Sequence, residues 1–149
     1  MQENLALLQE EMARMQAAAD YLAYSMTRCQ DLIGRHERSM EEMERLESLT
    51  SRFARLADLL IQRIFRLIDD IELTGASTVL DRIYRAEKRG FGAASDIIKI
   101  RELRNIIAHE YNGDKMEEIY HVVATLSPAL LVIVARTIAY VRGHQFVSS

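Results

Sequence analysis

The chain has 149 residues, of which 49% are hydrophobic and 28% are charged, and its formal net charge at pH 7 is −3. This length and composition are typical of a globular domain with one core, so we expect residues 1–149 to form a single helical domain. One proline, six glycines and no tryptophan, in a chain rich in Leu, Ala, Met, Glu and Arg, favour helix over strand. The only cysteine, Cys29, excludes an internal disulfide and a cysteine-based metal site, and we interpret it as a small buried thiol.

Targeting signals and the distribution of charge indicate where in the cell the protein is expected and which part of it could bind a polyanion. The first residues lack the basic flank and apolar core of a signal peptide, and no apolar run reaches the roughly 18 residues needed to span a bilayer. We therefore expect a cytoplasmic protein without a membrane partner. Residues 1–50 carry five basic and ten acidic side chains, whereas residues 51–110 carry eleven basic and nine acidic ones. Any polyanion binding is expected to be local and to involve the middle segment.

The first two expected helices cover residues 1–34 and 37–73. In the first, apolar residues recur at alternating steps of three and four, which is typical of a face packed on another helix: Leu5, Leu8, Met12, Met15, Ala19, Leu22, Met26, Cys29 and Ile33, while Asn4, Glu10, Glu11, Arg14 and Asp20 fall off this seam. The second has a similar set: Met40, Met43, Leu46, Leu49, Phe53, Leu56, Leu60, Ile64, Leu67, Ile68 and Ile71. One coiled coil through Gly34 is the alternative, since a glycine costs only about 1 kcal/mol in a helix. Such a rod would be about 100 Å long at roughly 1.5 Å per residue, so a hairpin is favoured.

The third expected helix covers residues 78–89. Before it, Gly75 suits the left-handed position after a helix, and Ser77 or Thr78 suits the N-cap. After it, the two glycines around Phe91 predict a turn that places this ring in the core.

The last two expected helices cover residues 96–111, with Ser95 as N-cap, and residues 115–143, with Asp114 as N-cap. Pro128 either kinks the last helix or splits it. No segment alternates long enough to predict a strand. The predicted fold class is all-α: an antiparallel helical bundle of five helices, or six if Pro128 breaks the last.

The fourth expected helix has a polar stripe. At about 100° per residue, the following residues lie on one face: Arg101, Asn105, Ala108, His109 and Asn112, with Arg104 at the edge. Arginine offers bidentate donors to phosphate, and histidine can transfer a proton near neutral pH, so the stripe suits a phosphodiester. In RNA the 2′-hydroxyl can attack, so neither a metal nor a protein nucleophile is required. The alternative is a solvated face or an ion-pair network with Glu102 and Glu110.

The segment from Arg104 to Tyr111, Arg-Asn-Ile-Ile-Ala-His-Glu-Tyr, resembles the signature of the HEPN superfamily. In that signature four to six residues separate an arginine from a histidine, and asparagine commonly follows the arginine. The His-x-Tyr extension, His109-Glu110-Tyr111, is similar to the HepT-like toxins of prokaryotic toxin–antitoxin pairs. The resemblance covers about residues 50–143.

This resemblance implies a HEPN-like bundle that acts as a metal-independent endoribonuclease without a cofactor. The substrate would be tRNA or mRNA, and the motifs of a homodimer or higher even oligomer would meet across a cleft. Arg104 would hold the scissile phosphate, His109 would transfer the proton, and Asn105 would orient the motif. Two proton transfers need two groups, which a second copy would provide.

The resemblance also implies a partner, a small nucleotidyltransferase of the MNT type that serves as antitoxin in a type II/VII-like system. In the HepT-like group this partner adds AMP to the tyrosine of His-x-Tyr, here Tyr111. The alternative for Tyr111 is a phenol in the core or at a dimer contact, because it falls on the apolar face.

Other residues leave further alternatives open. A basic cluster in the third helix is either a solvated face or a set of RNA phosphate contacts, with Arg101 as an accessory contact: Arg82, Arg85, Lys88 and Arg89. No other histidine stands at a metal-ligand spacing, so we expect His36, His121 and His144 to be structural or exposed. Two other functions are a non-catalytic partner subunit of a nucleotidyltransferase and a purely structural bundle.

Overall fold

The computed structural model describes residues 2–72, 74–75, 78–109 and 113–144, and within them the chain is all-helical without a strand. The elements are α1 (Gln2–Cys29), α2 (Met40–Asp58), η1 (Leu59–Ile64), α3 (Phe65–Ile71), α4 (Val79–Lys88), α5 (Ala94–His109) and α6 (Gly113–Gly143). Because η1 is a π-helical turn between α2 and α3, these three form one continuous helical path.

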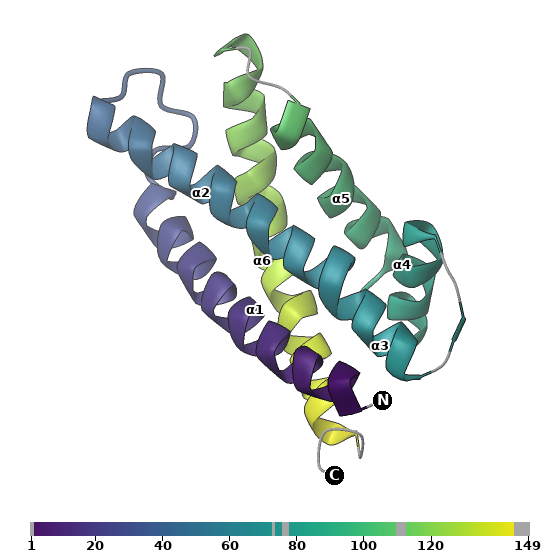
Figure 1. The fold of residues 1–149 in the computed structure, drawn as a ribbon. Coiled ribbons are helices and arrows are strands. Elements are labelled where there is room, and N and C mark those ends of the chain that lie inside the picture. The colour runs from purple at the N-terminus through teal and green to yellow at the C-terminus, as the bar shows by residue number, and fades with distance from the viewer. Residues whose placement is uncertain (1, 73, 76–77, 110–112, 145–149) are drawn as a thin grey trace.

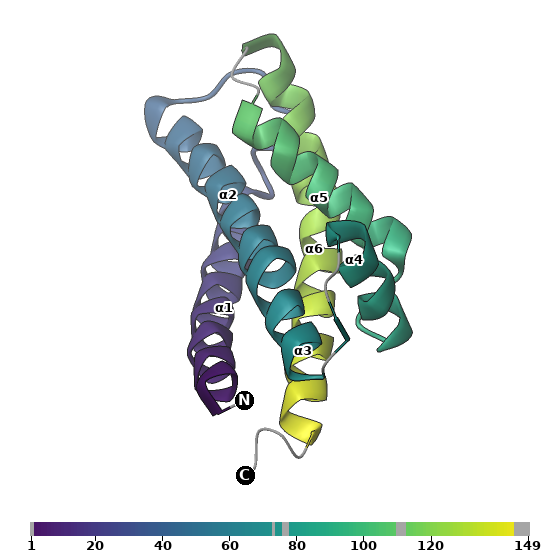
Figure 2. The ribbon, with the colours of Figure 1, turned by 45° about the vertical axis from the view of Figure 1, so that its right-hand side comes forward.

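The long helices form an antiparallel bundle (Figure 1). α1 packs against α2, and α6 contacts both of these helices and α5. α5 lies along α2 and α6, while the short α4 joins the end of the bundle where α3 ends (Figure 2). The predicted all-α helical bundle is therefore confirmed.

The break between the first two helices is wider than predicted. α1 ends at Cys29 rather than at residue 34, and the chain then turns, with Gly34 in the left-handed region at φ 88°. α2 begins at Met40 rather than at residue 37, because Ser39 forms an N-cap. Its hydroxyl accepts from the N–H of Glu42 at 3.1 Å, and the Glu42 carboxylate accepts from the N–H of Ser39 at 2.9 Å. A single coiled coil through Gly34 is thus excluded.

The predicted seams are buried or partly buried except at Met40, and one residue that was expected off the seam is buried. Met40 was expected to face the core but is 83% exposed, because it is the first residue of α2. Glu11, expected off the seam, is buried on α1, where its carboxylate lies 3.5 Å from the guanidinium of Arg63 on η1.

α4 begins and ends much as its sequence predicts. Thr78 is the N-cap and forms a reciprocal pair of hydrogen bonds with Asp81. Gly75 adopts a left-handed conformation at φ 81°, but three residues beyond the C-cap Glu72 rather than directly after the helix. At the other end Gly90 has φ 88°, and the N–H of Phe91 bonds the carbonyl of Ala86 at 3.0 Å.

Phe91 enters the core as predicted. It stacks on Phe65 at 5.7 Å between ring centroids and meets the edge of Tyr140 at 5.0 Å. α5 then begins at Ala94, not at residue 96, because the N–H of Ala94 donates to the carboxylate of Glu87 on α4 at 2.8 Å. The predicted N-cap Ser95 consequently lies inside the first turn.

α6 continues through Pro128 without a break, so the alternative of a sixth helix produced by this proline is excluded. The helix begins at Gly113, which places the predicted N-cap Asp114 inside it. By length and composition alone, Lys115–Gly143 could cross a membrane, which corrects the expectation that no stretch could. A core helix of a soluble protein passes the same test, and α6 buries Val123, Leu130 and Val141 in the bundle.

Candidate functional site

α5 presents the candidate residues because its other side is fixed in the bundle. Ile97, Ile100 and Leu103 are buried. The polar residues Arg101, Arg104 and Asn105 are half-buried, and His109 is exposed at the end of the helix. The motif residues therefore lie on the accessible side of one helix.

Arg104 forms a bidentate ion pair with Asp58, the last residue of α2. Its Nε donates to Oδ1 at 2.6 Å and its Nη2 donates to Oδ2 at 3.0 Å. The hydrogen bond and charge of Asp58 raise the pKa of Arg104 above its ordinary value, so the guanidinium stays charged. The side chains are 34% and 40% exposed, and such a pair contributes at most about 1 kcal/mol of stability. A phosphate could therefore displace the carboxylate at small cost.

From the sequence, an ion-pair network on this helix was one alternative, but with other partners. The alternatives considered were Glu102 and Glu110, which neighbour Arg104 on the helix. Glu102 is exposed and makes no ion pair with the rest of the described chain, whereas Glu110 lies outside the described residues. Asp58 precedes Arg104 by 46 positions, and no local pattern marks it.

Two adjoining hollows flank α5. The arginine hollow, with a volume of about 340 Å³, lies between α2, η1 and α5 and is lined by Ala57, Asp58, Ile61, Gln62, Arg63, Arg101, Arg104 and Asn105. The histidine groove, with a volume of about 840 Å³, lies between α5 and α6 and is lined by Lys99, Glu102, Leu103, Asn105, Ile106, His109, Lys115, Glu118, Ile119, His121, Val122, Thr125 and Leu126.

The structure separates the two motif residues. Arg104 and His109 are five positions apart, which corresponds to about 140° around a helix. Arg104 consequently lines the arginine hollow and His109 the histidine groove, while Asn105 lines both. A phosphate held by both side chains would have to lie across Asn105 or between two copies of the chain. Tyr111, the predicted site of AMP addition, lies outside the described residues.

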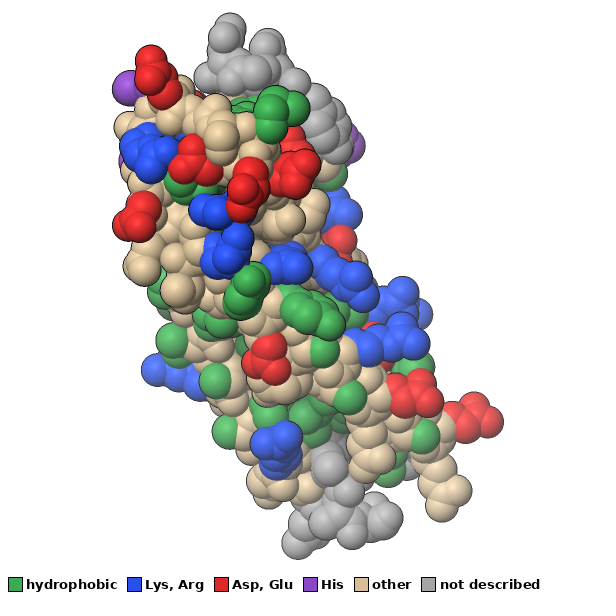
Figure 3. Space-filling model, turned by 90° about the vertical axis from the view of Figure 1, so that its left-hand side faces the viewer, with side chains coloured by type: hydrophobic (Ala, Val, Ile, Leu, Met, Phe, Trp, Pro, Cys, Tyr) green, Lys and Arg blue, Asp and Glu red, His purple; other side chains and the backbone are tan. Residues whose placement is uncertain are grey.

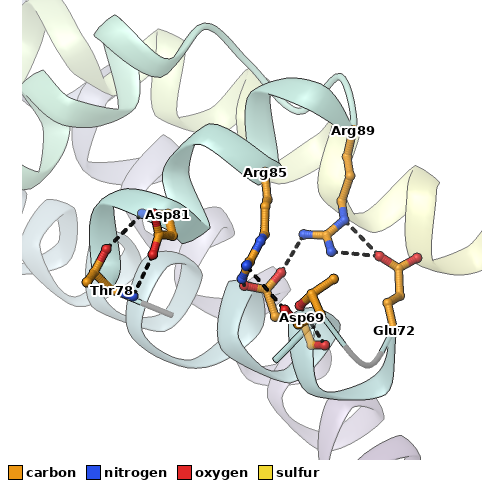
Figure 4. A network of polar contacts seen from close by, with 7 residues as sticks. Asp69, Glu72, Thr78, Asp81, Arg85 and Arg89 are labelled. Carbon is orange, nitrogen blue, oxygen red and sulfur yellow. Dashed lines mark hydrogen bonds and ion pairs between the residues drawn. The ribbon is translucent and has the colours of Figure 1, made fainter. Parts of the chain in front are cut away.

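The basic cluster on α4 is largely engaged within the chain (Figure 4). Arg85 donates to Asp69 at 3.1 Å and to the carbonyl of Thr74 at 3.2 Å, and Arg89 donates to Asp69 and Glu72, both at 2.8 Å. Burial opposes the charge of Arg89, but these carboxylates outweigh it and raise the pKa of Arg89.

The other two members of this cluster differ from Arg85 and Arg89. Lys88 is exposed, and Arg82 is half-buried with an Nε that has no hydrogen-bond partner within the described chain. Phosphate binding by any of the four stays a prediction. Arg85 and Arg89 would first have to leave buried carboxylate partners, so Lys88 and Arg82 are the members that could contact RNA without breaking an ion pair.

The remaining histidines differ in their surroundings. His121 is exposed and lines the histidine groove with His109, a proximity that sequence reasoning missed because α5 and α6 bring the two together only after folding. His144 packs on the ring of Tyr140, and its Nδ1 lies 2.7 Å from the carbonyl of that residue. His36 is exposed between α1 and α2. Within the described ranges no three His, Cys, Asp or Glu residues gather as metal ligands would.

Basic side chains also gather on a second face. Figure 3 views the side of the bundle on which α1 and α2 lie, and it shows Lys and Arg side chains in a band across the middle, with several acidic side chains above it. Arg28 and Arg52 cover the exposed rings of Tyr24 and Tyr21, at 5.5 and 5.4 Å. Local positive charge is thus not confined to α5.

Comparison of the chain with protein-family models, with curated proteins and with solved structures found no match. The HEPN resemblance therefore rests on the motif residues of α5 and their context.

Proposed function

We propose that the chain is a metal-independent endoribonuclease, the HEPN-like toxin of a toxin–antitoxin pair, whose site is completed by a second copy. The observation that carries this proposal is the placement of Arg104, Asn105 and His109 on the accessible side of α5, where Asn105 joins two adjoining hollows. A guanidinium and an imidazole so placed are suited to a phosphodiester that lies along the helix.

The proposed reaction uses the 2′-hydroxyl of RNA as nucleophile. A base removes its proton, the 2′-oxygen bonds to phosphorus, and the bond from phosphorus to the 5′-oxygen breaks as an acid protonates that oxygen. Arg104 stabilises the negative charge that develops on the phosphate. His109 carries out one of the two proton transfers, and His109 of the second copy carries out the other.

RNA cleavage by the purified chain in EDTA tests the proposal. We expect His109→Ala to lower the rate by about 10²- to 10⁴-fold, which is the usual contribution of a general acid or base. His121→Ala is the matched control, since this histidine lines the same groove. Unchanged cleavage by His109→Ala would refute the catalytic role, whereas comparable losses in His109→Ala and His121→Ala would place the second proton transfer within one chain.

We propose that an MNT-type nucleotidyltransferase silences the site by adding AMP to Tyr111. An anionic adduct two residues from His109 would repel and obstruct an RNA phosphate. Co-expression with such a partner is expected to add the mass of AMP to the chain and to abolish cleavage. Both effects should be absent in Tyr111→Phe.

A second candidate is a non-catalytic partner subunit of a nucleotidyltransferase. The pairing of Arg104 with Asp58, and its separation from His109 within one chain, favour this alternative. It predicts a stable complex with the partner and no cleavage of RNA by the chain in either the free or the bound state.

A further inference from the structure

We propose that the arginine hollow is a binding site for a phosphate of the RNA backbone, held by Arg63 and Arg101 beside the candidate catalytic residues. This inference rests on the proposed function, because the arginine hollow would give the candidate catalytic site a second contact to the RNA substrate. It adds η1, an element outside the motif helix, to the surface that binds RNA.

The charge of the hollow favours an anion. Three of its lining side chains are guanidiniums, those of Arg63, Arg101 and Arg104, and among the described residues Asp58 is the one acidic side chain in the lining. Its lining therefore carries a formal charge of +2. Charge of one sign in a concave site focuses the field and raises the local concentration of a polyanion.

The three guanidiniums differ in how firmly they are engaged. Arg104 is held by both oxygens of Asp58. Arg101 makes no ion pair within the described chain, and its Nε is buried without a hydrogen-bond acceptor. The side chain of Arg63 is 61% exposed, and its one ion pair within the described residues is with Glu11, at 3.5 Å. Arg101 and Arg63 are thus the groups that a phosphate can engage without displacing a short ion pair.

The π-helical turn explains why η1 contributes to the hollow. Four of its six residues, Leu59, Leu60, Ile61 and Ile64, are buried in the core. The two exposed residues, Gln62 and Arg63, both line the hollow. The same two residues also line a hollow on the side of α1, where the guanidinium of Arg63 meets Glu11, so η1 offers an amide and a guanidinium to the surface between α1 and α5. Single π turns are frequent at functional sites.

The lining favours a backbone phosphate over a base. In the part of the chain that the structure describes, the lining has no aromatic side chain on which a base could stack, and its apolar members are Ala57 and Ile61. Stacking on aromatic rings is the usual way in which proteins hold bases of single strands. A phosphodiester needs only donors, which arginine and glutamine supply.

Equilibrium binding of a fluorescein-labelled single-stranded RNA 12-mer, followed by anisotropy, tests the site. All variants carry His109→Ala, so that the proposed cleavage does not consume the probe. We expect Arg101→Gln and Arg63→Gln each to weaken binding by about three- to tenfold in 0.1 M salt and to lower the slope of log K against log salt by about 0.7. Arg136→Gln is the control, because Arg136 is exposed on α6, outside both hollows, and its loss changes the net charge equally.

The proposal fails if Arg101→Gln and Arg63→Gln bind RNA as Arg136→Gln does. Arg101→Lys guards against a folding effect, since it keeps the charge and should restore most of the slope that Arg101→Gln loses. AMP and inorganic phosphate are titrated as competitors. If AMP binds through Arg101 while RNA binding is independent of it, the hollow is a mononucleotide site and the inference is overturned.

These outcomes are separable from those of the proposed function. If His109→Ala cleaves RNA normally while Arg101→Gln loses the salt-dependent contact, the phosphate site stands and the catalytic proposal fails. If His109→Ala abolishes cleavage while Arg101→Gln and Arg63→Gln bind as the control does, the catalytic proposal stands and the phosphate site fails.

Discussion

Asp58 pairs with the guanidinium of Arg104 through both of its oxygens, a bidentate arrangement that arginine also forms with phosphate. Among the described residues, Asp58 is also the one acidic side chain that lines the arginine hollow. Its replacement should therefore release Arg104 and raise the charge of the lining. We expect Asp58→Asn to change the free energy of unfolding by less than about 1 kcal/mol, because the pair is partly exposed. The salt slope of RNA binding should rise by about 0.7, the value for one added phosphate contact.

Glu44→Gln is the control for this prediction. It removes the same charge from an exposed position on α2, the helix of Asp58, outside both hollows, where the carboxylate makes no ion pair with the described part of the chain. An equal rise of the slope in both variants would show a general charge effect and contradict a specific role for Asp58.

Glu42 is expected to make stability depend on pH. The backbone N–H of Ser39 is the main cause that lowers the pKa of Glu42 below its ordinary value, and the guanidinium of Arg35 lowers it further. A carboxyl whose pKa is lower in the folded than in the unfolded chain adds stability above the unfolded value and loses it as the pH falls through the folded value. We therefore expect Glu42→Gln to be less stable than wild type at pH 7, and the difference to vanish between about pH 5 and pH 3.

Urea unfolding at a series of pH values measures this difference. Glu44→Gln, an exposed carboxylate of the same helix without an ion pair in the described residues, is the control and should show no such trend. A difference for Glu42→Gln that stays constant down to pH 3 would contradict the role of the charge.

At the scale of elements, local signals predicted both ends of α4 but not every helix end. The N-cap Thr78 and the turn at Phe91 behave as predicted because their backbone hydrogen-bond partners lie within a few residues. The start of α2 was misplaced although its N-cap Ser39 and the partner Glu42 are also close in sequence. The start of α5 was misplaced because its first N–H is bonded by Glu87, a side chain of the preceding helix. The π turn of η1 was not predicted, because apolar spacing alone does not distinguish it from an α-helix.

The network between α3 and α4 provides a prediction at this scale. Asp69 is 2% exposed and accepts hydrogen bonds from both Arg85 and Arg89 (Figure 4). Removing one partner of a buried ion pair leaves an uncompensated charge, which typically costs about 3–5 kcal/mol. We expect Asp69→Ala to lower the free energy of unfolding by about this amount.

Chemical denaturation followed by circular dichroism measures the loss. The neighbouring Asp70→Ala is a matched control, because Asp70 is exposed and makes no ion pair within the described chain, so its change should stay within about 0.5 kcal/mol. Similar losses in the two variants would mean that the network does not hold α4 on α3.

For the molecule as a whole, the fold class could be predicted from periodicity, and the motif could be placed on one helix. The side chains that pack beside that helix could not be predicted in this way. Asp58, Arg63 and His121 reach the flanks of α5 from segments far away in the sequence, and only the packing of the bundle brings them there. The candidate residues on α5 could therefore be selected from the sequence, and their roles stay predictions, while the partners of those residues came from the structure.

The proposed site requires two copies of the chain, and the histidine groove offers a surface on which they could meet. Ile106 on α5 and Val122 on α6 line this groove and are 48% and 37% exposed. Exposed apolar side chains that gather at one place commonly mark an interface, and a symmetric contact there would bring two copies of His109 together. We expect Ile106→Glu to convert an even oligomer into a monomer and to abolish cleavage, because burying a charge without a partner opposes association.

Sedimentation equilibrium at micromolar concentration, run in parallel with the cleavage assay, measures both effects. Leu7→Glu is the control, since Leu7 is also exposed but lies on α1, outside both hollows. If the wild type is an active monomer, the composite site is wrong, and both proton transfers must come from one chain, with His121 as the second group in the groove. If Ile106→Glu remains an oligomer but loses activity, the groove binds RNA directly and the two copies meet elsewhere. Joint loss of assembly and activity in Ile106→Glu, with both retained in Leu7→Glu, would link catalysis to the pairing of two α5 helices across this groove.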